Sequence, residues 1–133
     1  MGIFTAVFEQ LESDPENKYT VGDIAFLKEF YKDQLPEERE KIKKFVRNGQ
    51  LDIVHGGMVS NDEACPNYSD ILRNFEAGHA FMMDEFGVKP RIGWQLDPFG
   101  HSAAHADLLA ELGMDTVVFA RVNKQEAKHR RME

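Results

Sequence analysis

Apolar residues recur along the chain at two different spacings, and the segments that carry them alternate. Helical spacing runs from Ile3 to Glu12, returns from Phe26 to Gln34, and extends through a long segment that ends before Gly87. Short and almost wholly apolar runs lie between these segments. We therefore predict strands close to residues 18–26, 51–54, 91–96 and 116–120.

Residues that cap or interrupt helices mark the ends of the helical segments. Pro36 opens a charged helix, Ser69 is a candidate N-cap for the long helix, and Gly87 ends that helix. Together with the periodicity, these signals predict helices at residues 3–12, 26–34, 36–47, 69–86 and 102–112, and a further one that begins near residue 123.

The alternation of helices with apolar strands indicates an α/β fold with a parallel sheet whose two faces are both covered. Right-handed crossovers place the carboxyl ends of all its strands on one side. Three positions follow predicted strands directly: His55 with Gly56 and Gly57, then Asp97, then Arg121. Ligands bind at that end of the strands in α/β proteins, so we expect these positions to form one site.

The composition narrows the range of partners. The chain has 133 residues, with 23 acidic and 16 basic side chains and a net charge of -7. This excess argues against nucleic acid or an anionic membrane surface as a partner. No apolar run approaches the roughly 20 residues that a membrane-spanning helix needs, and Cys65, the only cysteine, cannot form an internal disulfide. These properties fit a neutral ligand such as a sugar without requiring one.

Asp97 stands between a predicted strand and Pro98, with His101 four residues further on. Because Asp before Pro is common in turns, the position alone is compatible with a turn residue as well as with a catalytic or metal-binding carboxylate. We expect His101, at the start of a helix, to orient the loop through hydrogen bonds instead of binding a metal. Trp94 lies inside the strand, and we expect it in the core.

Two longer blocks of sequence carry a family resemblance. The segment Trp94–Ser102, which reads Trp-Gln-Leu-Asp-Pro-Phe-Gly-His-Ser, resembles the signature of the glycoside hydrolase family 38 α-mannosidases. The segment Gly56–Ala64 resembles the family's Gly-Gly-Trp-Val-x-Asn-Asp-Glu-Ala block, with Met58 in place of the usual tryptophan. Residues 18–27 and 119–121 also fall in register, so the resemblance extends from about residue 3 to the end.

The resemblance implies that residues 1–133 are a partial catalytic domain, incomplete at both ends, of a retaining zinc enzyme. It also implies that the complete domain is a seven-stranded, irregular parallel β/α barrel. In the family, the aspartate at the position of Asp97 is both the nucleophile and a zinc ligand. By the same resemblance, Arg121 steadies the nucleophile or contacts the substrate, and Met58 and Asp62 help to form the sugar-binding site.

The implied substrates are mannose-containing oligosaccharides of the N-glycan type, cleaved at terminal α-mannosyl linkages in a lysosomal or other acidic secretory compartment. The family's other zinc ligands and its acid/base aspartate belong to segments upstream and downstream of the matched region. We therefore expect the isolated chain to be inactive and to bind zinc weakly at best. Two alternatives stay open: a non-catalytic barrel segment that binds sugar or a partner chain, and another metal-dependent carbohydrate hydrolase such as a deacetylase.

Overall fold

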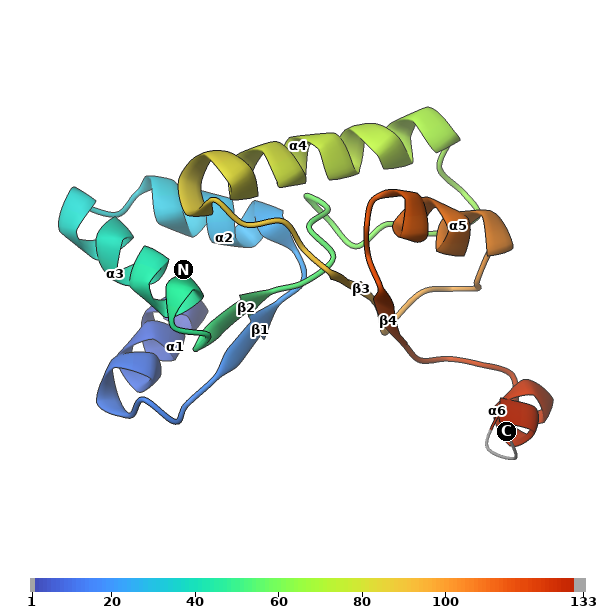
Figure 1. The fold of residues 1–133 in the computed structure, drawn as a ribbon, viewed down its shortest axis with the longest axis horizontal. Helices are drawn as coiled ribbons and strands as arrows, with labels where there is room; N and C mark the ends of the chain where they lie inside the picture. The colour runs from blue at the N-terminus through green and yellow to red at the C-terminus, as the bar shows by residue number, and fades with distance from the viewer. Residues whose placement is uncertain (1, 131–133) are drawn as a thin grey trace.

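The computed structural model describes residues 2–130, and helices alternate with short strands along that range (Figure 1). In chain order the elements are α1 Gly2–Ser13, β1 Tyr19–Val21, α2 Ile24–Lys32, α3 Pro36–Arg47, β2 Leu51–Ile53, α4 Tyr68–Phe86, β3 Ile92–Gln95, α5 Ala103–Glu111, β4 Thr116–Phe119 and α6 Lys124–Arg130. The α/β class and the order of elements that the sequence predicts are confirmed. None of the helices in this range is long and apolar enough to cross a membrane.

The strands form two parallel pairs instead of one continuous sheet. Strand β1 pairs with β2, and β3 pairs with β4, both in parallel register. One backbone hydrogen bond joins the two pairs, from the amide of His55 to the carbonyl oxygen of Ile92 at 2.6 Å. The parallel arrangement is therefore confirmed, while closure into a seven-stranded barrel lies beyond what residues 2–130 contain.

The predicted first strand is too long at its carboxyl end. Strand β1 stops at Val21, and Ile24 already begins α2. Ile24 and Leu27 are fully buried at helical spacing, whereas 67% of Phe26 is exposed, which is the pattern of an amphipathic helix. A short apolar run fits both spacings, and the choice is made by the contact of α2 with the loop after β2, where the Ala25 amide donates to the carbonyl of Met58 at 2.8 Å.

The long helix begins earlier than its predicted cap. Asn67 is the N-cap residue of α4, not Ser69, and its carbonyl accepts the amides of Asp70 and Ile71 at 2.9 and 3.2 Å. Gly87 ends the helix as predicted, in the left-handed conformation with φ 66°.

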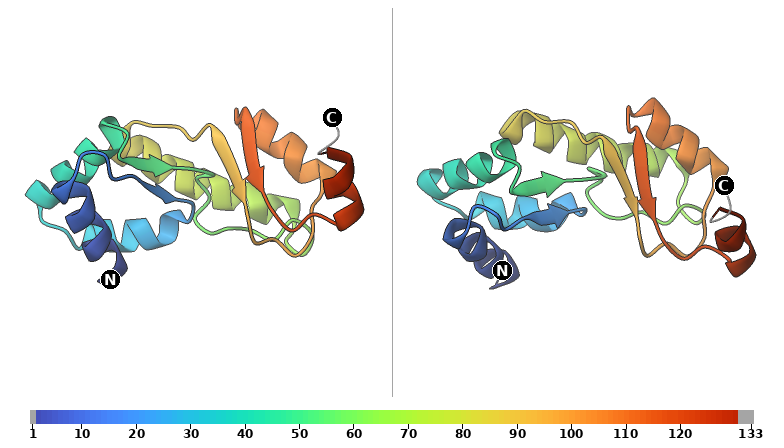
Figure 2. Two further views of the ribbon diagram at one scale, coloured as in Figure 1. Left: turned by 90° about the horizontal axis from the view of Figure 1, so that it is seen from below. Right: turned by 60° about the horizontal axis from the view of Figure 1, so that its bottom comes forward.

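Helix α4 runs along both strand pairs and contributes to two separate cores (Figures 1 and 2). Its carboxyl-terminal half buries Met82 in the larger core, over β1 and β2. Its amino-terminal half buries Ile71 and Phe75 in the smaller core, against α5. One helix therefore fixes the position of the second strand pair relative to the first.

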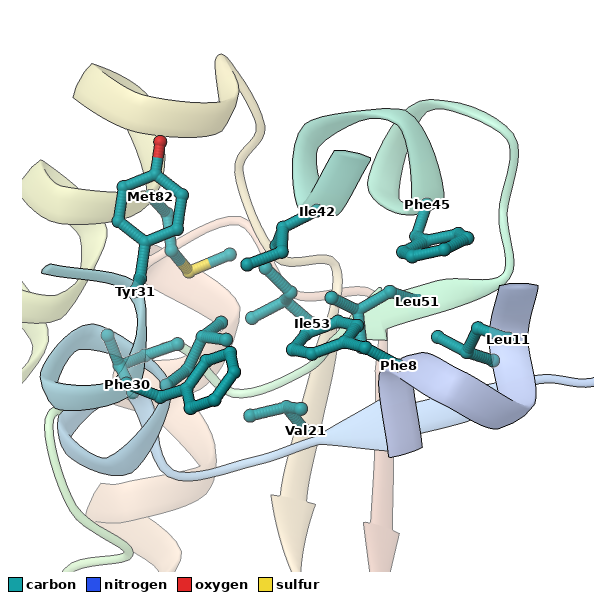
Figure 3. Packing of buried hydrophobic residues seen from close by; sticks show 12 residues of the cluster. Phe8, Leu11, Val21, Phe30, Tyr31, Ile42, Phe45, Leu51, Ile53 and Met82 are labelled. Atoms are coloured by element: carbon teal, nitrogen blue, oxygen red, sulfur yellow. The ribbon is translucent and has the colours of Figure 1, made fainter. Parts of the chain in front are cut away.

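Aromatic rings from three helices pack together in the larger core (Figure 3). Phe8 of α1 lies 5.5 Å from Phe30 of α2 and 5.9 Å from Phe45 of α3, measured between ring centroids. Phe8, Phe30 and Phe45 are each less than a tenth exposed, and burying such rings stabilises this half of the chain.

Strand β4 is less covered than its apolar sequence predicts. Val117, Val118 and Phe119 are 38%, 37% and 40% exposed, so the expectation of a sheet covered on both faces is wrong for this strand within residues 2–130. An almost wholly apolar strand is typical of the interior of a parallel sheet. Its exposure here means that side chains of residues 2–130 leave apolar surface of β4 uncovered.

Candidate functional site

Asp97 and Arg121 meet at the carboxyl ends of neighbouring strands. The register of the second pair sets Gln95 of β3 opposite Phe119 of β4. Asp97 and Arg121 each lie two residues beyond these partners, and the guanidinium Nη2 forms an ion pair with Asp97 Oδ1. The Asp97 side chain is 77% exposed and that of Arg121 is 52% exposed, so both are open to a ligand from solvent.

Arg121 adopts a backbone conformation that non-glycine residues rarely take. Its φ is 58°, in the left-handed region, where a Cβ crowds the backbone. From this backbone position the guanidinium meets Asp97 beyond the end of β3. The same guanidinium lies 5.5 Å from the ring centroid of Phe99, which is 83% exposed. Sequence reasoning did not single out Phe99, because an aromatic residue in a loop gives no signal of its own.

A buried carboxylate lies beside this exposed pair. Only 4% of the Glu63 side chain is exposed, and its Oε1 is 3.1 Å from Nδ1 of His101. Its Oε2 accepts the backbone amide of Ser102 at 2.6 Å. His101 Nε2 in turn donates to the carbonyl of Ala120 at 2.9 Å. The expectation that His101 orients the loop through hydrogen bonds is confirmed, and Glu63 is the partner that the sequence did not reveal.

His55 lies below the site instead of in it. The side chain is completely buried, and its Nδ1 accepts the Trp94 amide at 3.2 Å, which places the ring proton on Nε2, 3.4 Å from Oδ1 of Asn61. Burial lowers the pKa of His55 to about 4, and the neighbouring His105 adds to this shift. His55 is therefore a neutral core histidine that ties β2 to β3, and the expectation that it joins the surface site is wrong.

The two glycines after His55 serve the packing of α4. Gly56 has φ 83°, and its carbonyl lies so close to Gly78 that no Cβ would fit there. Gly57 approaches Asn74, the residue of α4 whose carbonyl accepts the amide of Met58 at 3.2 Å. The close backbone approach at this glycine pair is thus made to a helix of the same chain.

Met58 and Asp62, the two predicted substrate contacts in the loop after β2, both contact other residues of this chain. The Met58 side chain packs against the larger core. Asp62 Oδ1 accepts the amides of Ala64 and Cys65, both at 2.7 Å, and these hydrogen bonds lower the pKa of Asp62. Their contribution to a sugar site stays a prediction. Trp94 lies against Gly22, where an added Cβ would be 3.0 Å from the indole Cδ1. The Trp94 side chain is only half-buried, so it is less enclosed than expected for a core residue.

The described residues do not form a metal site by themselves. No group of three or more His, Cys, Asp or Glu side chains within residues 2–130 could hold a metal ion. His105 and Asp107 lie two residues apart on α5 and are both possible metal ligands, but His105 is buried and Asp107 is exposed. His105 Nε2 is 3.0 Å from Nε2 of Gln95. Asp97 is therefore at most one ligand of a zinc site, which needs about four.

Sequence comparison identifies the group of proteins to which these features belong. The model of the glycosyl hydrolases family 38 N-terminal domain matches residues 1–133. The chain belongs to this family. It is 42% identical over 132 residues to an alpha-mannosidase of Canavalia ensiformis and 40% identical over 132 residues to a probable alpha-mannosidase of Arabidopsis thaliana. A lysosomal alpha-mannosidase of Cavia porcellus is 36% identical over 137 residues.

These alignments cover 98% of this family 38 chain but only 13% to 14% of each relative. The chain thus spans about one seventh of the length of these curated relatives. Among solved structures, an alpha-mannosidase from Enterococcus faecalis is similar with a TM-score of 0.76 and 24% identity, over 89% of this chain and 13% of that one. A 4-alpha-glucanotransferase from Thermococcus litoralis has a TM-score of 0.70 and 22% identity, over 92% and 20% of the two chains. At these sequence identities, both similarities show that the fold is shared and nothing more.

Proposed function

We propose that this chain is part of the catalytic domain of a retaining, zinc-dependent α-mannosidase, with Asp97 as its nucleophile. Membership in family 38 and the names of the relatives support the reaction class. The single structural observation that carries the assignment is the exposed Asp97–Arg121 ion pair at the ends of β3 and β4. Ligands bind at this end of parallel strands.

The proposed chemistry divides the two oxygens of Asp97. Oδ1 is paired with Arg121, which holds the carboxylate in a fixed direction. Oδ2 attacks the anomeric carbon of the mannosyl residue, the bond to the leaving oxygen breaks, and a glycosyl-enzyme intermediate forms that water then hydrolyses. Phe99, exposed beside the guanidinium, offers an apolar face to the sugar ring.

Two components of this mechanism must come from a longer parent chain. A retaining glycosidase needs a second carboxyl group to protonate the leaving oxygen and later to activate water. Zinc, which would grip sugar hydroxyls beside Asp97, needs ligands in addition to this carboxylate. Residues 1–133 alone are therefore proposed to be inactive.

The proposed substrates are oligosaccharides with terminal α-mannosyl residues, as in N-glycans. Met58 and Asp62 are proposed to line the sugar site from the loop after β2. Met58 lacks the flat aromatic face that a tryptophan offers to a pyranose, so stacking there is weaker. The lysosomal names of relatives from Dictyostelium discoideum and Cavia porcellus support an acidic compartment for the parent protein.

The test is the Asp97→Asn variant of the parent protein. It removes the nucleophilic oxygen and retains the volume of the side chain, so kcat on an aryl α-mannoside should fall by roughly a thousandfold or more. Asp107→Asn on the exposed side of α5 is the matched control and should leave kcat unchanged. Retained activity in Asp97→Asn, or a product released with inverted anomeric configuration, would remove the assignment.

A further inference from the structure

Three loops at the carboxyl ends of the strands meet at the Glu63–His101 pair. Glu63 follows β2, His101 follows β3, and Ala120 follows β4. His101 spans the other two, with Nδ1 at 3.1 Å from Glu63 Oε1 and Nε2 at 2.9 Å from the carbonyl oxygen of Ala120. The Phe119 ring packs edge-on against the imidazole, 5.6 Å away between centroids. No other side chain among residues 2–130 is shown to hydrogen bond to two of these loops at once.

The burial of Glu63 makes this contact strong. With 4% of the side chain exposed, the carboxylate has lost most of its water and needs partners for both oxygens. The Ser102 amide, at 2.6 Å, supplies one and His101 the other. Removing either partner leaves a buried charge unpaired, so the loops after β2 and β3 are held together firmly.

The hydrogen-bonding partners of His101 favour its doubly protonated form. A backbone carbonyl can only accept, so Nε2 carries a proton. A second proton on Nδ1 would let the ring donate to Glu63 Oε1 as well, and the ring would then be an imidazolium. The Ala120 carbonyl, and after it Glu63, raises the pKa of His101 above its usual value. The other titratable groups around it are His105 of α5 and Glu126 of α6, which line the same cavity as Glu63 and His101.

The Ala120 carbonyl belongs to the peptide that enters Arg121. Fixing this peptide plane restricts the rotation that sets φ of Arg121, which at 58° needs support from its surroundings. We infer that Glu63 and His101 are positioning residues, and that the doubly protonated His101 holds the Ala120–Arg121 peptide so that the guanidinium meets Asp97. The expected effect on activity rests on the proposed function. The expected effect on the position of the Arg121 guanidinium does not.

The two ring protons of His101 determine how the contact should depend on pH. The contact is complete while His101 is charged and loses one hydrogen bond as pH rises through its raised pKa. Activity of the parent protein should therefore fall on the alkaline side with the titration of this ring. Acidic conditions keep the contact closed.

The experiment compares Glu63→Gln and His101→Gln in the parent protein with the exposed controls Glu76→Gln and His129→Gln. Glu63→Gln should lower kcat about tenfold with a smaller change in KM, and should move the alkaline limb to lower pH. His101→Gln, which has an amide donor for the Ala120 carbonyl but no titrating ring, should lower kcat and remove the part of that limb that the ring causes, leaving the part caused by the acid/base carboxyl group. Both controls should retain the normal profile.

A second measurement separates this inference from the proposed function. Ring nitrogen NMR of 15N-histidine-labelled parent protein should show an imidazolium at His101 at pH 6, with a lower pKa in Glu63→Gln. A neutral ring at pH 6, or an active enzyme whose kcat and pH profile ignore both variants, overturns the inference. An inactive wild-type protein with the imidazolium present overturns the proposed function and leaves the positioning contact established.

Discussion

The contact between α4 and the glycine bend after β2 allows a sharp test of the fold. A Cβ on Gly78 would overlap the carbonyl oxygen of Gly56 and lie 3.0 Å from both the Gly56 carbonyl carbon and the Met58 amide nitrogen. All three atoms are backbone atoms, so no side-chain rotation relieves the clash. Alanine is preferred to glycine in a helix by about 1 kcal/mol, whereas overpacking costs about 1–3 kcal/mol and occasionally more.

Because backbone atoms cannot move aside, the overpacking cost is taken at its upper value of about 3 kcal/mol; less the gain of about 1 kcal/mol in helix propensity, Gly78→Ala should destabilise the protein by about 2 kcal/mol. The measurement is the free energy of unfolding in urea, with hydrogen exchange at the Met58 amide, which donates to Asn74, as a local readout. Ala77→Gly, at the exposed neighbouring position of α4, is the control and should lose about 1 kcal/mol through propensity alone. A Gly78→Ala variant as stable as the wild type would refute the direct packing of α4 on the bend.

Two further predictions concern buried polar groups. Gln50 is 6% exposed and its Nε2 donates to the carbonyl of Leu11 at 2.8 Å, so Gln50→Ala should lower the unfolding free energy by about 2 kcal/mol; an unchanged urea midpoint would contradict this. The pKa of His55 is lowered from 6.5 to about 4 in the folded chain. As the pH falls below 6.5, His55 therefore binds a proton in the unfolded chain but not in the folded one. Stability should be complete above that pH and fall by about 3 kcal/mol as the pH approaches 4, measured by urea unfolding between pH 7 and 4.5; a flat profile would show that His55 is not buried.

Much of the fold could be predicted because its signals are local. The proline at position 36 and the glycine at 87 act through their own backbone preferences, and they mark helix ends in any context. The apolar run after β1 could not be assigned in this way. Ile24 fits a strand or a helix by spacing. Two tertiary contacts decide for the helix: the burial of Ile24 and Leu27 in the larger core, and the hydrogen bond from the Ala25 amide to the Met58 carbonyl.

The sequence by itself determined the alternation of elements, the parallel strands, and the presence of Asp97 and Arg121 at strand ends, because each follows from short-range pattern and chain direction. The tertiary structure alone decided which of these strand-end residues meet. Register between β3 and β4 joins Asp97 to Arg121. Packing of α4 takes the glycine bend and His55 into the interior. The partnership of Glu63 with His101, separated by 38 residues, arises from the convergence of three loops, and no local pattern encodes such a distance.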